Sequence, residues 1–184
     1  GLVLTTPSVV YQVTLQNGSV REVHRPNDLP STSSLRAIAE PFVKVVLLCP
    51  ADAVGGVMDL VTQKRGVYHA TEYLSERRVT LTYELPLSEI LVEFYDRLKS
   101  ITRGYGSFDY EFIGYRPAHL VRLDILLNGR LCEPLSSIVP KAKAYDRGKA
   151  LVARLKTLIP RQLFEVAIQA AVGSHVIARE SLRP

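Results

Sequence analysis

The 184-residue sequence has no tryptophan, one methionine and only two cysteines, Cys49 and Cys132. Two cysteines are too few for a disulfide framework, so a reducing compartment fits best. No apolar run approaches the roughly 18 residues of a membrane-spanning helix, which argues against an integral membrane protein. The sequence also lacks an initiating methionine and a signal peptide, and we expect it to be a piece of a longer protein.

The motifs of common catalytic sites are missing as well. There is no Gly-x-x-x-x-Gly-Lys-Ser/Thr loop, no Gly-x-Gly-x-x-Gly at a helix start and no Gly-x-Ser-x-Gly elbow. Cys49 ends an apolar strand and is interpreted as a buried, inert thiol. Asp109 and Glu111 share one face of a predicted strand, as an acid/base pair would, but an exposed sheet face explains them better. The histidines have no partner at metal-ligand spacing, so neither a catalytic nor a metal site is predicted: His24, His69, His119 and His175.

The charge is unevenly distributed along the chain. Residues 1–115 carry 11 basic and 13 acidic side chains, whereas residues 116–184 carry 12 basic and 5 acidic ones. A basic C-terminal part joined to a near-neutral N-terminal part indicates that the C-terminal part meets a polyanion. Nucleic acid is the first expectation, and an anionic membrane surface is the second.

The N-terminal segment has the pattern of a β-hairpin. Residues 8–15 and 20–24 are rich in β-branched side chains and predict two strands. Asn17-Gly18 between them favours a type I′ turn, in which both central residues have positive φ. A hairpin alone is only marginally stable, so we expect this one to belong to a domain truncated at its N-terminus. Residues 26–34 have the composition of a linker.

Residues 41–116 predict the order β-α-β-β-α-β, which is the ferredoxin-like layout of the α+β class. Apolar spacing predicts a helix over residues 54–61 that Gly66 closes, and one continuous helix from Pro86 to Ile101 that Gly104 ends. Alternation predicts the strands around them, at residues 42–49, 67–74, 79–83 and 107–115.

Residues 120–184 predict a second, smaller α+β domain. Strands at 120–127 and 131–139 flank an Asn128-Gly129 turn, and further strands are expected at 164–171 and 175–178. A helix over residues 145–159 lies between them and ends at Pro160. Its predicted inward face contains Gly148, Leu151, Val152, Leu155, Leu158 and Ile159.

This helix and its flanks hold the strongest local signal for function. Seven basic residues fall within 21 positions and only Asp146 opposes them: Lys141, Lys143, Arg147, Lys149, Arg154, Lys156 and Arg161. At 100° per residue, Arg147 and Arg154 lie on one flank of the apolar stripe, and Lys149 and Lys156 lie on the other. We predict that they contact nucleic-acid phosphates, with a solvated basic face as the alternative.

The segment from Arg103 to Phe108 is the second candidate. Its two glycines allow a ligand to approach the backbone, while Arg103 and Tyr105 offer a cation for phosphate and a ring for a base. The alternative is a helix end followed by a turn.

Three segments carry a resemblance to a known family. Residues 81–89, 97–116 and 159–171 resemble the C-terminal half of LepA-type proteins, the elongation factor 4 family of translational GTPases related to elongation factor G. The resemblance implies that residues 1–38 end a preceding domain, that 40–116 form the ferredoxin-like domain shared with elongation factor G, and that 117–184 begin the LepA-specific domain. His175 stands where a basic residue is expected, which makes a phosphate contact there doubtful.

The family implies a function for the parent protein and a smaller one for this piece. The parent hydrolyses GTP with Mg²⁺ in an N-terminal domain absent here, so no catalytic residue and no cofactor are expected in this chain. It is expected to be a cytoplasmic monomer that contacts the ribosome, its ribosomal RNA and tRNA. Three alternatives remain: a protein-interaction module that uses the sheet face, an enzyme built on Asp109 and Glu111, and peripheral binding to anionic lipid at the inner face of the plasma membrane.

Overall fold

The computed structural model describes residues 9–184, which fall into two compact units. Of these residues, unit 1 comprises 9–12 and 39–117, and unit 2 comprises 13–38 and 118–184. The predicted strand start at Ser8 lies outside the described residues. The cuts between the units lie close to the expected boundaries, but residues 13–38 cluster with the C-terminal part. Their assignment to the end of a preceding domain stays a prediction.

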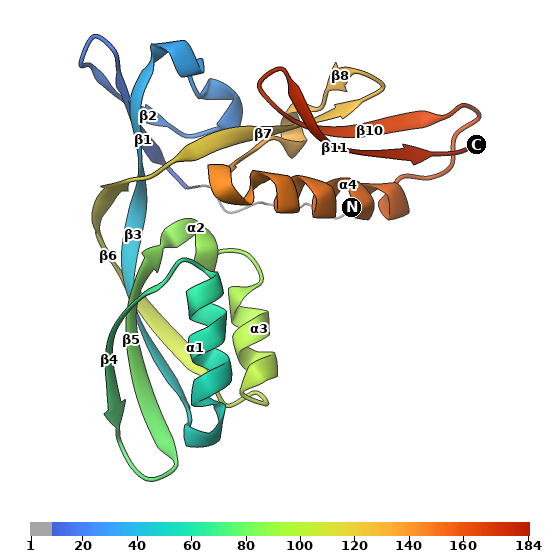
Figure 1. The fold of residues 1–184 in the computed structure, drawn as a ribbon. Coiled ribbons are helices and arrows are strands. Elements are labelled where there is room, and N and C mark those ends of the chain that lie inside the picture. Colours follow the sequence, from blue (N-terminus) through green and yellow to red (C-terminus); the bar gives the residue numbers. More distant parts are fainter. Residues whose placement is uncertain (1–8) are drawn as a thin grey trace. The chain divides into compact units, whose positions relative to one another are not determined.

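Unit 1 contains an antiparallel sheet with the strand order β4-β5-β3-β6. Its strands are β3 (Leu35–Pro50), β4 (Val67–Tyr73), β5 (Arg78–Pro86) and β6 (Ser107–Pro117). Helices α1 (Val54–Gln63) and α3 (Phe94–Ile101) lie on the same face of this sheet (Figure 1). The first and third strands of the β-α-β-β-α-β unit are adjacent, so the expected ferredoxin-like fold is confirmed.

Strict alternation builds the core of unit 1. Every second residue of β3 from Val43 to Cys49 and of β5 from Val79 to Leu85 is buried against the helices. The helices contribute Phe94 and Leu98 from α3 and the stripe of Val57, Leu60 and Val61 from α1. Each fully buried side chain of this kind stabilises the fold by about 1.5–3 kcal/mol. Asp109 and Glu111 are exposed on the opposite face, paired in register with Val46 and Lys44.

Two helix predictions in unit 1 are wrong in detail. The second predicted helix is broken into α2 (Leu87–Ile90) and α3, because Glu93 adopts a left-handed backbone with φ 61°. The residue with positive φ after α1 is Arg65 rather than Gly66. Gly66 has another role, since a Cβ there would stand 2.4 Å from Val61 Cγ1.

The left-handed conformation of Arg65 directs its guanidinium into a buried cluster of carboxylates. Arg65 donates to both oxygens of Glu40 at 2.8 and 2.9 Å and to Glu89 Oε1 at 3.1 Å. Glu40 and Glu89 are buried. Burial opposes the charge of Arg65, but the hydrogen bonds and charges of the two glutamates outweigh it and raise the pKa of the guanidinium. The single guanidinium therefore compensates part of the charge of two buried carboxylates inside the unit.

The hairpin of β1 (Tyr11–Leu15) and β2 (Val20–Val23) extends the sheet of β3 in the order β2-β1-β3, and from Val13 on it falls in unit 2. Only Gly18 of its predicted type I′ turn has positive φ, at 87°, and Leu15 N–H bonds to Ser19 O, so three residues close the loop. The linker contains two short 3₁₀ turns, η1 (Pro26–Asp28) and η2 (Thr32–Ser34). Gln16 N–H and Nε2–H donate to Ser34 O and Leu35 O, which ties the hairpin to the linker.

The second sheet lies in unit 2 and has the order β11-β10-β7-β8, and β9 also pairs with β7. Its strands are β7 (Leu120–Leu127), β8 (Arg130–Leu131), β9 (Ser137–Pro140), β10 (Val166–Val172) and β11 (His175–Leu182). Asn128 and Gly129 have φ 50° and 78°, as a type I′ turn requires. The predicted single strand 131–139 is interrupted by the 3₁₀ turn η4 (Glu133–Leu135). Within residues 9–184, no helix is long and apolar enough to cross a membrane.

Candidate nucleic-acid interface

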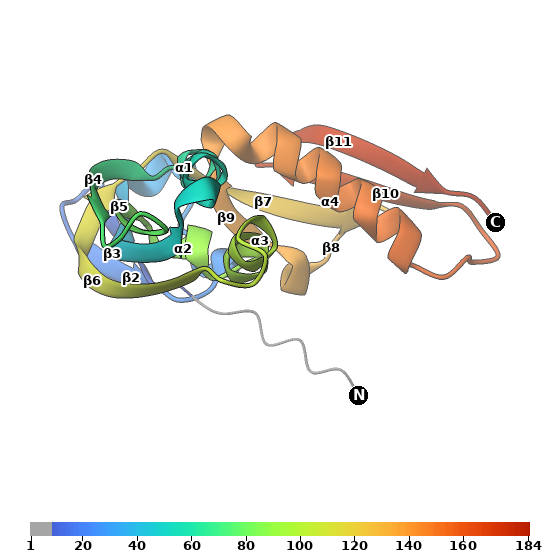
Figure 2. The ribbon, with the colours of Figure 1, turned by 90° about the horizontal axis from the view of Figure 1, so that it is seen from below.

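Helix α4 (Ala144–Leu158) follows the 3₁₀ turn η5 (Lys141–Lys143) and lies along the second sheet of unit 2 (Figure 2). Its buried residues are Ala144, Gly148, Val152 and Leu155. A Cβ at Gly148 would stand 3.0 Å from Ile177 Cδ1 and 3.1 Å from Ala170 Cβ, so the glycine allows a close approach of helix and sheet. One face of α4 is thereby fixed inward, and the basic side chains occupy its flanks and outer face.

The structure divides the predicted basic residues by their surroundings. Lys143 and Arg147 are half-buried and each has an interaction within the chain. Lys156 is exposed but donates to Glu180 Oε2 at 3.3 Å. The remaining four are exposed and have no carboxylate at ion-pair distance among residues 9–184: Lys141, Lys149, Arg154 and Arg161. Of the seven predicted basic residues, these four are the ones whose charge is compensated only by the surrounding solvent and its ions.

The connection from α4 to β10 exposes apolar side chains that the sequence pattern places differently. The pattern predicts that Leu158 points inward, but it is 65% exposed, because the helix ends at this residue. The pattern also predicts Phe164 in a strand, but it is 80% exposed, because β10 starts only at Val166. Leu163 is 89% exposed beside it. Arg161 is therefore flanked by exposed apolar groups.

The second predicted candidate, Arg103 and Tyr105, lies in unit 1 on the turn between α3 and β6. Arg103 Nη2 donates to both carboxylate oxygens of Asp52 at 2.9 and 3.1 Å, so this cation is neutralised within the chain. Tyr105 is 74% exposed and its ring is free to meet a ligand. Arg103 is thus held in an ion pair, and only Tyr105 of the two remains available to a ligand.

A buried threonine fixes the turn that carries Tyr105. Thr102 Oγ1 donates to Leu98 O at 2.7 Å and accepts the N–H of Gly106 at 2.7 Å. Tyr105 N–H donates to Thr102 O at 3.1 Å, and a Cβ at Gly106 would clash with the Thr102 side chain at 2.6 Å. Tyr105 is therefore presented by a closed, hydrogen-bonded turn.

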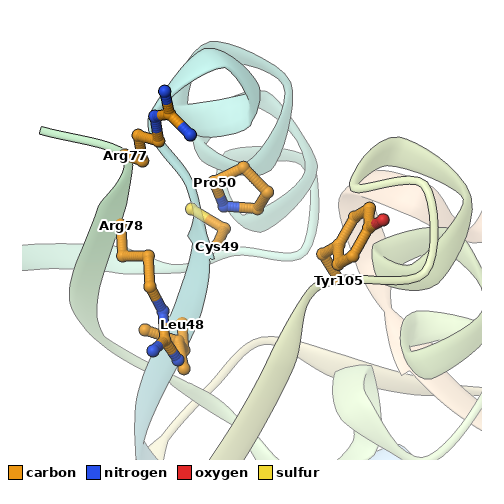
Figure 3. Close-up of a pocket in the computed structure, with 6 residues that line it drawn as sticks. All are labelled: Leu48, Cys49, Pro50, Arg77, Arg78 and Tyr105. Carbon is orange, nitrogen blue, oxygen red and sulfur yellow. The ribbon is translucent and has the colours of Figure 1, made fainter.

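Tyr105 borders a hollow that the sequence pattern does not predict. The hollow has a volume of about 210 Å³ and is lined by Leu48, Cys49, Pro50, Arg77, Arg78 and Tyr105 (Figure 3). The two arginines come from the start of β5 and the preceding turn, which the sequence indicates only as a tight turn at Glu76-Arg77. Nothing in local sequence spacing links them to Tyr105.

The other chemically reactive side chains do not form a site in the described part of the chain. Burial raises the pKa of the Cys49 thiol, which keeps it protonated and unreactive, and Cys132 is a free, half-buried thiol. His69 Nε2 lies 3.1 Å from Glu84 Oε2, and His24 Nε2 lies 3.2 Å from Glu22 Oε2. Among residues 9–184, no group of three or more His, Cys, Asp or Glu side chains is arranged to hold a metal ion.

Two family models match consecutive parts of the chain. Residues 37–126 match the elongation factor G C-terminus, and residues 127–184 match the C-terminus of the GTP-binding protein LepA. Proteins named elongation factor 4 from Anoxybacillus flavithermus and Halalkalibacterium halodurans are 52% and 50% identical over 182 residues, 99% of this chain. The chain belongs to the LepA (elongation factor 4) family.

This LepA-family chain spans about 30% of the length of the two relatives. A crystal structure of a protein from Thermus thermophilus is 29% identical to it over 45% of this chain and 12% of that one, with a TM-score of 0.42. The two family models meet at residues 126 and 127, at the end of β7, whereas the compact units meet at 117 and 118. Strand β7 therefore belongs by sequence to the first model and by packing to the LepA-specific part.

The family assignment does not favour the alternative of a separate protein-interaction module. Phosphate contact by the predicted side chains stays a prediction.

Proposed function

We propose that this chain is the ribosome-contacting C-terminal portion of a LepA-type translational GTPase and docks on RNA through α4. The observation that carries the proposal is the set of exposed cations without a carboxylate partner among residues 9–184, on α4 and its flanks: Lys141, Lys149, Arg154 and Arg161. Support also comes from the net charge of unit 2, which has 14 basic and 7 acidic residues. Ribosomal RNA and tRNA are the partners that these cations fit.

The proposed mechanism is electrostatic docking with little base reading. Each lysine or arginine that neutralises a phosphate releases counterions, which makes binding strong at low salt and weak at high salt. The deep, narrow major groove of A-form RNA excludes side chains, so recognition follows backbone shape. The closely packed helix positions the cations before binding, which lowers the entropy cost of association.

In this proposal, GTP hydrolysis by the parent protein takes place outside this chain. We infer that GTP and Mg²⁺ bind in the part of the relatives' length that this chain does not match, and that this portion itself is a non-enzymatic, monomeric docking module. The parent would act in the cytoplasm on translating ribosomes. Anionic lipid at the inner face of the plasma membrane is the competing partner, because phospholipid headgroups attract the same cations. Binding to lipid in place of RNA would contradict the proposal.

The test is co-sedimentation of the 184-residue chain with 70S ribosomes over a salt series. The variant K149A/R154A/R161A removes three exposed cations without a carboxylate partner among residues 9–184, while Lys156 and Arg147 are left because they have partners within the chain. The control R21A/R36A/R130A removes the same charge from exposed positions of unit 2 outside residues 141–161.

We expect the α4 variant to lower the slope of log K against log salt by about 2–3 and the control to change it by less than about 1. Equal effects of both variants would contradict docking through α4. Salt-independent binding would favour a protein partner. Binding to phosphatidylglycerol vesicles but not to ribosomes would favour the membrane.

A further inference from the structure

Strand β6 lies at one edge of the sheet of unit 1 and has one open side. Among residues 9–184, β6 pairs with β3 and with no other strand. Every second residue of such a strand turns its backbone N–H and C=O away from its neighbour, so these groups lack a strand partner. Proteins usually block an open edge with a bulge, a proline or lysines. On β6 the bulge falls at Ile113 and the proline is Pro117, so residues 107–112 form a regular open edge.

The opposite edge of the sheet, β4, is less suited to pairing. A bulge between Tyr68 and Ala70 divides this strand near its middle. Tyr68 is also engaged within the chain, because its ring packs edge-on against Tyr83 with 5.5 Å between the centroids, and its hydroxyl lies 2.8 Å from Thr71 Oγ1. Residues 107–112 of β6 are therefore the edge that a further strand can extend.

The face of β6 that turns toward the helices carries exposed aromatic rings. Phe108, Tyr110 and Phe112 pair in register with buried residues of β3, so they share the core side of the sheet. Phe108 packs on Phe94, the first residue of α3, with 5.0 Å between the ring centroids. The next two rings extend beyond the start of the helix, and Tyr110 and Phe112 are 52% and 59% exposed. Apolar side chains of an added strand would pack on this uncovered row.

The opposite face of β6 carries acidic side chains. Asp109 and Glu111 are exposed, and neither has a cation at ion-pair distance among residues 9–184, although Lys44 stands opposite Glu111 in the register. These charges repel RNA phosphates and anionic lipid. Pairing of two copies of β6 would bring like charges together, which destabilises a strand pair. The same charges attract lysine and arginine, so they favour a basic polypeptide as the occupant of the edge.

We propose that the open edge of β6 binds an extended, basic segment of a partner protein as an additional strand. Backbone hydrogen bonds to residues 107–112 hold this segment. Its apolar side chains, at alternate positions, pack on Tyr110 and Phe112, and the lysines or arginines between them face the acidic residues of β6. The partner segment therefore alternates apolar and basic residues over about six positions. This contact adds to the RNA docking proposed for α4 of unit 2, and neither depends on the other.

The experiment is a fluorescence-anisotropy titration of the 184-residue chain with the fluorescein-labelled peptide Lys-Val-Lys-Val-Lys-Val-Lys. Amide hydrogen exchange with the unlabelled peptide, measured by NMR, identifies the backbone groups that become protected. Two N-methylated versions of the peptide, one methylated at the valines and one at the inner lysines, each block the N–H groups of one edge. A peptide of four lysines followed by three valines keeps the composition but removes the alternation.

Two charge variants test the acidic face. D109N/E111Q removes both charges with little change of shape, and the control D59N/E76Q removes one aspartate and one glutamate that are exposed elsewhere in unit 1. We expect D109N/E111Q to weaken peptide binding about threefold to tenfold and the control to weaken it less than about twofold. Equal effects of the two variants would contradict pairing of the peptide with this face.

Two further variants test the aromatic face. Y110A/F112A removes the two exposed rings, and the control Y73A/F164A removes one exposed tyrosine and one exposed phenylalanine outside β6. All of these rings are at least half exposed, so the variants should still fold. We expect Y110A/F112A to weaken peptide binding about threefold to tenfold and the control less than about twofold. A control that weakens binding as much as Y110A/F112A would contradict packing on this row.

The backbone measurements decide whether the peptide is an added strand. We expect protection from exchange to rise at alternate amides of residues 107–112. One N-methylated peptide should bind about tenfold more weakly or worse, while the other stays within about twofold, because only one edge of an added strand faces β6. The peptide without alternation should bind at least about fivefold more weakly.

Several outcomes would overturn the proposal. The first is equal binding of both N-methylated peptides, and the second is equal binding of the alternating and non-alternating peptides. The third is no binding at about 1 mM peptide. Protection of residues 107–112 by hexauridylate would assign the edge to RNA, and protection that rises with protein concentration alone would assign it to a second copy. None of these measurements involves the ribosome, so failure here leaves the proposed function untouched.

Discussion

The two units differ in their balance of charge and in how much of it they pair internally. The described part of unit 1 has 9 basic and 11 acidic residues, and it pairs most of its arginines internally. Unit 2 has 14 basic and 7 acidic residues, and several of its cations have no carboxylate within the described residues to neutralise them. An internally paired arginine stabilises the fold, whereas an unpaired one is available to an external anion. A paired arginine such as Arg65 therefore has a structural role, whereas an unpaired one such as Arg154 has a candidate binding role.

The largest expected effect comes from breaking the internal pairing of unit 1. In R65M, Glu40 and Glu89 would stay buried without their cation, which costs about 3–5 kcal/mol for a broken buried ion pair. Urea unfolding measures the loss, and R97M, on the exposed face of α3, should change the free energy of unfolding by less than about 0.5 kcal/mol. A loss below about 1 kcal/mol in R65M would show that the cluster does not hold unit 1 together.

The same cluster predicts a dependence of stability on alkaline pH. Burial, and then the charge of Glu40, raise the pKa of Tyr11 from 10.0 to about 12. Because the folded pKa is the higher one, the stabilisation is complete below pH 10 and is lost as the pH rises from 10 to about 12, by at most about 2–3 kcal/mol.

Y11F has no phenol to ionise and should lose less stability over this pH range than the unmodified protein. Urea unfolding at pH 9, 10, 11 and 12 measures the difference, with Y145F as the control because Tyr145 is exposed on α4. If Y11F and the unmodified protein declined in parallel, Tyr11 would titrate like a solvent-exposed tyrosine and the cluster would not extend to β1.

Sequence pattern predicted the fold well because local periodicity determines which faces are buried. Alternation in β3 and β5 and the apolar stripes of α1 and α3 were sufficient for the ferredoxin-like order. The break at Glu93 was missed because the apolar spacing from Leu87 to Ile101 continues across it. A periodic pattern does not report a single residue with positive φ.

The sequence pattern missed features of the candidate sites that depend on residues far apart in the chain. Asp52 lies 51 positions before Arg103, and Glu180 lies 24 positions after Lys156, so neither ion pair is visible in local charge patterns. The hollow depends on the register of β3 with β5 and β6, which brings Arg78 near Tyr105. Sequence could identify the basic residues but not which of them the fold leaves without a partner.

The smallest expected effect comes from releasing a paired cation in unit 2. Lys156 and Glu180 form an exposed ion pair, and such pairs contribute about 0–1 kcal/mol to stability. E180Q should therefore leave the free energy of unfolding within about 1 kcal/mol and free Lys156 for phosphate. Ribosome binding at low salt should then strengthen about twofold to fivefold, the equivalent of up to about 1 kcal/mol.

The control is E165Q, which removes an exposed carboxylate of unit 2 without releasing a lysine. Stronger binding by E180Q than by E165Q would mean that Lys156 contacts RNA once it is unpaired. Equal strengthening by both would mean that only the net charge of unit 2 matters, because the two variants change that charge equally. In that case the distinction between paired and unpaired cations would hold for the rigid, buried cluster of unit 1 but not for the exposed side chains of α4.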